Sequence, residues 1–162
     1  MKFKFPQSYR ANRPKFFQLL GKILMKLSGW KIKGQISDLY ENKKFVAIVA
    51  PHTSNWDAVV GLAAIAAIDL KVYFIGKHTV FTGLLGKFMK YMGGIPVDRS
   101  KPGGLIKDLM RQIEDKKNGL IGLAPEGTRS KVGEWKTGFL RIARELNSGV
   151  VLISFPISSR VL

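Results

Sequence analysis

The sequence has no cysteine and only two histidines among its 162 residues. Without cysteine, the chain can form no disulfide, no thiolate nucleophile and no cysteine-bound metal site. His52 and His78 stand far apart in the sequence, and neither belongs to an HExxH pattern. We therefore expect no metal site built from protein side chains.

Long apolar stretches are also missing. The longest uncharged apolar run, Ala58–Ile68, has 11 residues, whereas a transmembrane helix needs roughly 20. The basic N-terminus lacks the apolar core and the cleavage site of a signal peptide. We therefore expect no membrane-spanning helix. Because 46% of the residues are hydrophobic, we expect one globular domain.

Acidic residues are absent from the first 37 positions. The whole chain has 27 Lys and Arg against 11 Asp and Glu, which gives a formal net charge of +16. Such a basic segment indicates an anionic partner: a membrane surface, a nucleic acid or an acidic protein. The cations of this segment are Lys2, Lys4, Arg10, Arg13, Lys15, Lys22, Lys26, Lys31 and Lys33.

A basic amphipathic helix is predicted from Pro14 to about Ser28. Pro14 suits a first helical turn, and Gly29 suits a helix end. The helix can lie in the interface of a bilayer, or it can pack its apolar stripe on the core of the domain. The sequence leaves both alternatives open. Lysines lie opposite the apolar stripe, which consists of Phe16, Leu20, Ile23, Leu24 and Leu27.

Strands and helices alternate along the rest of the chain. Short β-branched or aromatic runs predict strands, and longer periodic segments predict helices. The alternation predicts an α/β domain with a mostly parallel sheet flanked by helices, preceded by an irregular stretch over residues 1–13. The expected strands are residues 30–36, 45–50, 71–75, 94–97, 120–124 and 150–157, and the expected helices are 54–68, 81–91, 105–117 and 135–146.

Polar loops follow three of these strands, at the edge of a parallel sheet where active sites gather. The first loop, PHTSNWD, contains His52 and Asp57. In one interpretation, Ser54 and Asp57 only cap the following helix. In the other, Asp57 accepts one imidazole N–H of His52 and leaves the second nitrogen free as a general base for a substrate hydroxyl.

The remaining loops carry groups that can hold an anionic substrate. In PEGTRS, the glycine lets the backbone come close to a ligand, and the threonine offers a hydroxyl group. The arginine can bind a phosphate through two parallel hydrogen bonds. Each residue is also explained as part of a solvated turn. Together with the His/Asp pair, they favour attack by a hydroxyl on a substrate that also bears a phosphate. The candidates are Glu126, Gly127, Thr128 and Arg129, with Asp98 and Arg99 of the VDRS loop and Lys77 and His78 as a cationic rim.

These residues resemble the glycerolipid acyltransferase family, typified by 1-acylglycerol-3-phosphate acyltransferase. The similarity covers about residues 45–162, and the wording of its motifs resembles a small bacterial branch. Four blocks of the family occur in order: the H-x4-D block His52–Asp57, the second block Gly94–Arg99, the E-G-T-R block Pro125–Arg129, and a hydrophobic strand with a proline, Ile153–Ile157.

The resemblance implies a glycerol-3-phosphate acyltransferase-like fold and an O-acyltransferase that needs no cofactor. A fatty acyl group would pass from acyl-CoA or acyl carrier protein to a hydroxyl of a (lyso)glycerophospholipid-type acceptor. His52 would be the general base, and Asp57 would orient it. By the same analogy the acceptor would be held by Arg99, Glu126, Gly127 and Arg129, to which the residue chemistry adds Thr128 and Lys77.

Two departures from the family shape the remaining expectations. The chain ends six residues after Pro156, where relatives usually continue, and no transmembrane anchor precedes the first block. We expect the basic segment 1–37 to attach an acyltransferase domain, residues 38–162, to the cytoplasmic face of the cell membrane. That domain is expected to be short at its C-terminus. No nucleic-acid partner is expected, because no RNP1, helix-turn-helix or zinc-finger pattern occurs. The alternative is a non-catalytic membrane-lipid-binding domain of the same fold.

Overall fold

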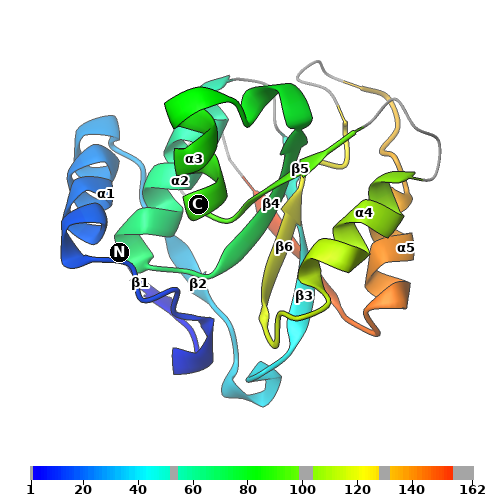
Figure 1. Ribbon diagram of the computed structural model, residues 1–162. Coiled ribbons are helices and arrows are strands. Elements are labelled where there is room, and N and C mark those ends of the chain that lie inside the picture. The colour runs from blue at the N-terminus through cyan, green and yellow to red at the C-terminus, as the bar shows by residue number, and fades with distance from the viewer. Residues whose placement is uncertain (1, 52–54, 99–103, 128–131, 155–162) are drawn as a thin grey trace.

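A computed structural model of the chain describes residues 2–51, 55–98, 104–127 and 132–154. Its centre is a five-stranded sheet in the order β5-β4-β6-β3-β7, and every pair of neighbouring strands in it is parallel. This arrangement confirms the predicted α/β fold with a mostly parallel sheet (Figure 1). The strands are β3 (Lys44–Ala50), β4 (Val72–Lys77), β5 (Gly94–Val97), β6 (Gly119–Leu123) and β7 (Val150–Ser154).

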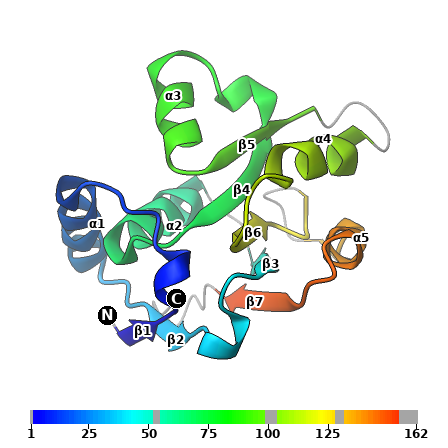
Figure 2. The ribbon, with the colours of Figure 1, turned by 60° about the horizontal axis from the view of Figure 1, so that its bottom comes forward.

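Helices cover both faces of the sheet (Figures 1 and 2). On one face lie α1 (Lys15–Ser28), α2 (Asn55–Ile68) and α3 (Gly83–Tyr91). On the other lie α4 (Gly104–Ile113) and α5 (Gly138–Glu145). Among the described residues, no helix has the length and apolar character needed to cross a bilayer.

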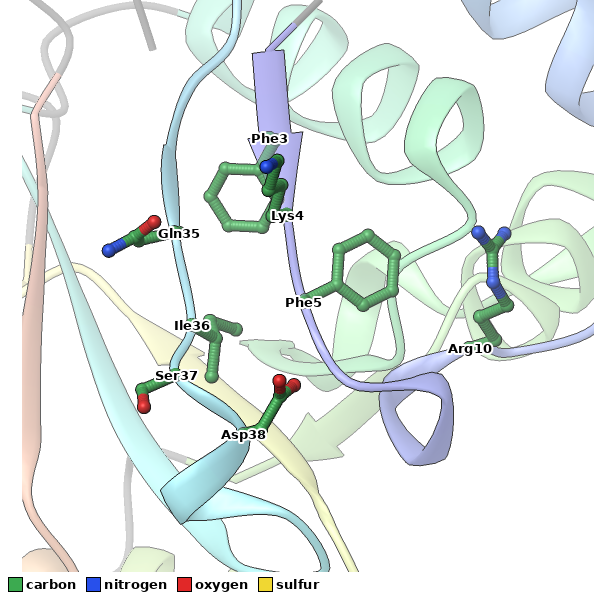
Figure 3. Close-up of a pocket in the computed structure, with 8 residues that line it drawn as sticks. All are labelled: Phe3, Lys4, Phe5, Arg10, Gln35, Ile36, Ser37 and Asp38. Carbon is green, nitrogen blue, oxygen red and sulfur yellow. The ribbon is translucent and has the colours of Figure 1, made fainter.

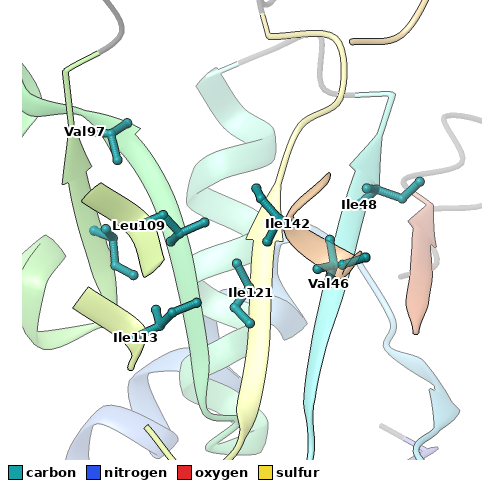
Figure 4. Packing of buried hydrophobic residues seen from close by; sticks show 9 residues of the cluster. Val46, Ile48, Val97, Leu109, Ile113, Ile121 and Ile142 are labelled. Atoms are coloured by element: carbon teal, nitrogen blue, oxygen red, sulfur yellow. The ribbon is translucent and has the colours of Figure 1, made fainter. Parts of the chain in front are cut away.

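The core lies on both sides of the sheet because successive strand residues point to opposite faces. Val46 and Ile48 of β3 pack with residues of α4 and α5, among them Leu109, Ile113 and Ile142 (Figure 4). The intervening residues of β3, Phe45 and Ala47, are buried on the α2 side. A strand that is covered on both faces reads as a continuous apolar run, which explains why FVAIVA was recognisable in the sequence.

Three helices have bounds that differ from the prediction. Helix α3 begins after Phe81, whose ring instead packs against Gly76 of β4 and Gly94 of β5. Helix α4 ends at Ile113, four residues earlier than expected. Helix α5 begins later than expected, because the backbone N–H of Lys136 donates to Pro125 O at 2.9 Å and holds that segment in a turn.

The expectation of an irregular stretch over residues 1–13 is wrong in part. Strand β1 (Lys2–Lys4) pairs in parallel with β2 (Lys33–Gln35), and a 3₁₀ turn, η1 (Gln7–Tyr9), follows it. Tyr9 is fully buried and donates its hydroxyl to the carbonyls of Tyr40 (3.0 Å) and Lys43 (2.8 Å). Tyr9, Met25 and Ile32 all belong to the buried core clusters.

Helix α1 turns its apolar stripe away from the rest of the molecule. It packs on α2 through Gly21 and Met25, the two buried residues of the helix. The alternative in which the stripe packs on the core of the domain is therefore wrong. Every residue of the predicted stripe is exposed: Phe16 by 68%, Leu20 by 42%, Ile23 by 46%, Leu24 by 41% and Leu27 by 78%.

Candidate functional site

The polar loops predicted from the sequence all leave the same edge of the sheet, because its strands are parallel. Strand β6 lies between β4 and β3. Ile48 of β3 is aligned with Leu123 of β6. Neighbouring strands lie about 4.8 Å apart, so the segments that follow these two strands leave the same part of the sheet edge. They are the segment that contains the H-x4-D block and the segment that contains the E-G-T-R block.

Asp57 is the described member of the predicted His/Asp pair. It lies in the first turn of α2 and is half-buried. His52 and Ser54 lie outside the described residues. The helix cap and the His/Asp pair therefore both stay predictions, and both are compatible with an aspartate at the start of a helix, where the helix dipole favours a negative charge.

A tight turn follows β6 and places Glu126 and Gly127. The backbone N–H of Gly127 donates to Ala124 O at 3.1 Å, and Gly127 has a φ of +65°, which favours glycine. Pro125 is fully buried, and Glu126 is only 6% exposed. A buried carboxylate is costly unless it is paired or hydrogen-bonded, and Glu126 does have an interaction partner in the fold. Thr128 and Arg129 lie outside the described residues.

Lys136 is a candidate site residue that the sequence did not indicate. Its backbone N–H donates to Pro125 O, and its side chain crosses the face of Gly127. A Cβ built on Gly127 would lie 3.0 Å from Lys136 Cδ and 3.1 Å from Nζ. The signal in the sequence was a lysine two residues before a helix, since a cation near a helix N-terminus is unfavourable without a compensating role.

The cationic rim is spread over the neighbouring strands. Lys77, which is exposed, ends β4 and is aligned with Val97 of β5. Asp98 follows Val97 and is half-buried, whereas Arg99 lies outside the described residues. Strand β4 adjoins β6, but β5 is two strands away from β6 and three from β3, or about 10 and 14 Å. Lys77 therefore lies closer to the E-G-T-R segment than the VDRS loop does.

A cavity of about 560 Å³ lies away from these loops, beside β1, β2 and the segment that follows β2 (Figure 3). The Arg10 guanidinium lies over the Phe5 ring at 5.5 Å, and its Nε donates to Gln7 at 2.7 Å. None of the predicted site residues that the structure describes lines the cavity. Its lining consists of Phe3, Lys4, Phe5, Arg10, Gln35, Ile36, Ser37 and Asp38.

No metal centre is evident in the described ranges, where no three His, Asp or Glu side chains come together as possible ligands. His78 lies in the short turn η3 (His78–Val80) directly after β4 and is exposed. The described residues supply carboxylates, lysines and backbone groups to this edge of the sheet, and the sequence adds His52, Thr128 and the arginines.

The fold is thus a parallel α/β sheet in which the H-x4-D segment follows a strand beside the one that precedes the E-G-T-R segment. The model of the acyltransferase family matches residues 31–158, so this chain belongs to the acyltransferase family. This membership confirms the resemblance found in the sequence. No curated protein matches the chain.

A solved structure shares the fold. It is the crystal structure of the 1-acyl-sn-glycerophosphate (LPA) acyltransferase PlsC from Thermotoga maritima, with a TM-score of 0.56 and 20% sequence identity. The similarity covers 84% of this chain and 54% of the Thermotoga maritima chain, so this chain spans about half of the length of that protein. The likeness confirms the predicted acyltransferase-like fold.

Proposed function

We propose that this protein transfers a fatty acyl group from acyl-CoA or acyl carrier protein to a hydroxyl of a (lyso)glycerophospholipid-type acceptor, in phospholipid biosynthesis or remodelling. His52 takes the proton of the acceptor hydroxyl, and Asp57 holds the imidazole in the required tautomer. The hydroxyl oxygen forms a bond with the thioester carbonyl carbon, the C–S bond breaks, and the thiol leaves with a proton. No cofactor is needed.

One observation carries this proposal. In a member of the acyltransferase family, the segment after β3 and the segment after β6 begin next to each other at one edge of the sheet. The first segment carries His52 and Asp57, and the second carries Glu126, Gly127, Thr128 and Arg129. This arrangement supports a site in which the base and the groups for a phosphate-bearing acceptor act on the same substrate. Lys77 at the end of β4 and Arg99 after β5 complete the acceptor site in this proposal.

The proposal includes attachment to an anionic membrane surface from the cytoplasmic side. The exposed apolar stripe of α1 supports it, because an amphipathic helix that packs through another face leaves its stripe for a bilayer. Three lysines, Lys15, Lys22 and Lys26, are exposed on the same helix. Each cation near an anionic leaflet adds about 1 kcal/mol to binding.

Release of free coenzyme A thiol from a long-chain acyl-CoA, with and without lysophosphatidic acid, tests the reaction. We expect release that depends on the acceptor in the wild type and its loss in His52→Ala. Glu114→Ala is the control, because Glu114 is exposed directly after α4, at the end of the sheet opposite these loops. Turnover by a folded His52→Ala variant would contradict the mechanism.

The second candidate is a non-catalytic membrane-lipid-binding domain. The stripe of α1 favours it, because membrane binding through this helix does not depend on the loops at the sheet edge. It predicts binding to anionic vesicles without consumption of acyl-CoA or acyl-acyl carrier protein thioesters. The thiol assay with both donors, combined with vesicle sedimentation, separates the two candidates.

A further inference from the structure

Helix α3 buries its glycine side and exposes its large apolar side chains. Gly86 is the buried residue of this nine-residue helix, and a Cβ at Gly86 would collide with the backbone of Phe81. Each residue of an α-helix turns about 100°, so Leu84, Phe88 and Tyr91 lie roughly opposite Gly86. These three side chains are 84%, 39% and 47% exposed. Gly86 is thus buried against the segment that leads into the helix, whose Phe81 ring packs on the sheet, and the helix presents its apolar side outward.

Helix α1 has the same unusual arrangement. Its buried glycine, Gly21, lies against α2, and its apolar stripe is exposed. The surface helices of a globular protein normally do the opposite and turn their apolar side to the core. Two helices with exposed apolar stripes on one face of the molecule indicate a surface that binds something.

Three aromatic rings join the two stripes into one surface. Phe16 and Phe17 of α1 lie edge to face with ring centroids 5.6 Å apart, and Phe17 lies 5.2 Å from Tyr91 of α3. The residues at the two ends, Phe16 and Tyr91, are exposed. Both helices lie on the same face of the sheet (Figure 2). The exposed stripe of α1 thus continues through these rings onto α3.

The charge around this surface selects its partner. Residues 58–97, which include most of α2 and all of α3, contain one acidic residue, Asp69, and residues 1–37 contain none. Asp69 is buried in an ion pair with Arg13. Lys87 and Lys90 are exposed on α3, as the lysines of α1 are. An apolar surface with a purely cationic rim complements an anionic lipid bilayer, whereas a second copy of a chain with net charge +16 would be repelled.

We infer that α3 is a second membrane-contacting helix and that α1 and α3 bind an anionic bilayer together as one surface. Helix α3 begins six residues after Lys77, the last residue of β4. It therefore extends the bilayer contact to the edge of the sheet that carries the candidate site, where a lipid acceptor has to arrive. This inference deepens the membrane attachment of the proposed function, but it does not depend on acyl transfer.

Sedimentation with vesicles of phosphatidylcholine and phosphatidylglycerol tests the inference without any acyl donor. We expect the double variant Leu84→Gln/Phe88→Gln to lower the vesicle partition coefficient about tenfold or more, because both side chains lose their burial in lipid. The matched control is Leu39→Gln/Leu140→Gln, which alters two leucines that are 83% and 52% exposed away from α1 and α3. Its partition coefficient should equal that of the wild type.

Three outcomes would overturn the inference. The first is an unchanged partition coefficient in the α3 variant, with a far-UV circular dichroism spectrum like that of the wild type. The second is an equal loss in the control variant, which would indicate nonspecific adsorption. The third is a variant that changes self-association in light scattering but not vesicle binding, which would make a second copy the partner. The His52→Ala variant should bind vesicles as the wild type does, so failure of the proposed reaction is distinguishable.

Discussion

Arg13 and Asp69 form a buried ion pair, in which Arg13 Nη1 lies 3.6 Å from Asp69 Oδ1. The guanidinium also donates to Leu70 O (3.0 Å) and Met92 O (3.1 Å), and the carboxylate accepts the backbone N–H groups of Asn12 and Arg13. Burial lowers the pKa of Arg13, and the charge of Asp69 opposes this effect. The pair joins the segment before α1 to the start of β4 and to the end of α3.

Neutralising Asp69 should destabilise the fold strongly. Asparagine can adopt the backbone conformation at this position, which has a φ of +58°. Asp69→Asn nevertheless leaves the buried guanidinium without a counter-charge. We expect the free energy of unfolding to fall by about 3–5 kcal/mol in urea denaturation. Asp108→Asn is the control, because its ion pair with Arg111 has the same length, 3.6 Å, but is exposed. Its loss should stay under about 1 kcal/mol, and equal losses in both variants would contradict the prediction.

A methyl group at Gly21 should separate α1 from α2. The added Cβ would lie 2.5 Å from Ala67 N and 2.7 Å from Ala63 O, and backbone atoms cannot move aside as a flexible side chain does. We expect Gly21→Ala to lower the unfolding free energy by about 1–3 kcal/mol. Gly138→Ala, where a Cβ meets nothing within 4 Å, should be neutral or slightly stabilising. A Gly21→Ala variant as stable as the wild type would mean that the two helices are not in close contact.

The strands and the class of fold could be predicted because a parallel sheet covered on both faces leaves continuous apolar runs in the sequence. The direction of the α1 stripe could not. Periodicity identifies an apolar face but does not say what that face meets. Here the helix packs through Gly21, and a glycine carries no periodic signal. The bounds of α3 and α5 also depend on distant contacts, of Phe81 with two glycines of the sheet and of Lys136 with Pro125.

The candidate site could be predicted in part for a similar reason. Loops after parallel strands share one edge, so the grouping of the motif loops followed from the alternation of strands and helices. The order of the strands could not be predicted in this way. This order places β6 beside β3 and places β5 farther away. Lys136 was missed because it precedes a helix rather than following a strand.

Alkaline pH should destabilise the protein through Tyr9. Burial raises the pKa of Tyr9 to about 12 from the 10 of a free tyrosine. The folded state therefore favours the neutral phenol, and this contribution is complete below pH 10 and is lost as the pH rises toward 12. Tyr9→Phe should cost about 1–2 kcal/mol at neutral pH, because two carbonyl groups lose their donor.

Unfolding in urea at neutral pH and at several values above pH 10 checks the Tyr9 prediction. The stability of the wild type should fall more steeply in this window than that of Tyr9→Phe, since both proteins share all other titrating groups. Parallel curves would mean that Tyr9 does not keep its proton in the folded state.

Gly127 and Lys136 should act on the acceptor as a unit. Gly127→Ala places a Cβ about 3 Å from the lysine side chain, and it strains a position with a φ of +65° by about 1–2 kcal/mol. If the lysine holds the phosphate of the acceptor, Lys136→Met should raise the KM for lysophosphatidic acid about tenfold or more, the effect of losing a hydrogen bond to a charged group. Gly127→Ala should raise KM because it displaces that lysine, and the double variant should then have a KM little higher than that of the worse single variant.

Lys116→Met is the control, at an exposed position after α4, and should leave KM unchanged. If the rise in KM of the double variant equals the product of the two single rises, the residues act separately. The glycine would then be needed for the turn rather than for the placement of the lysine.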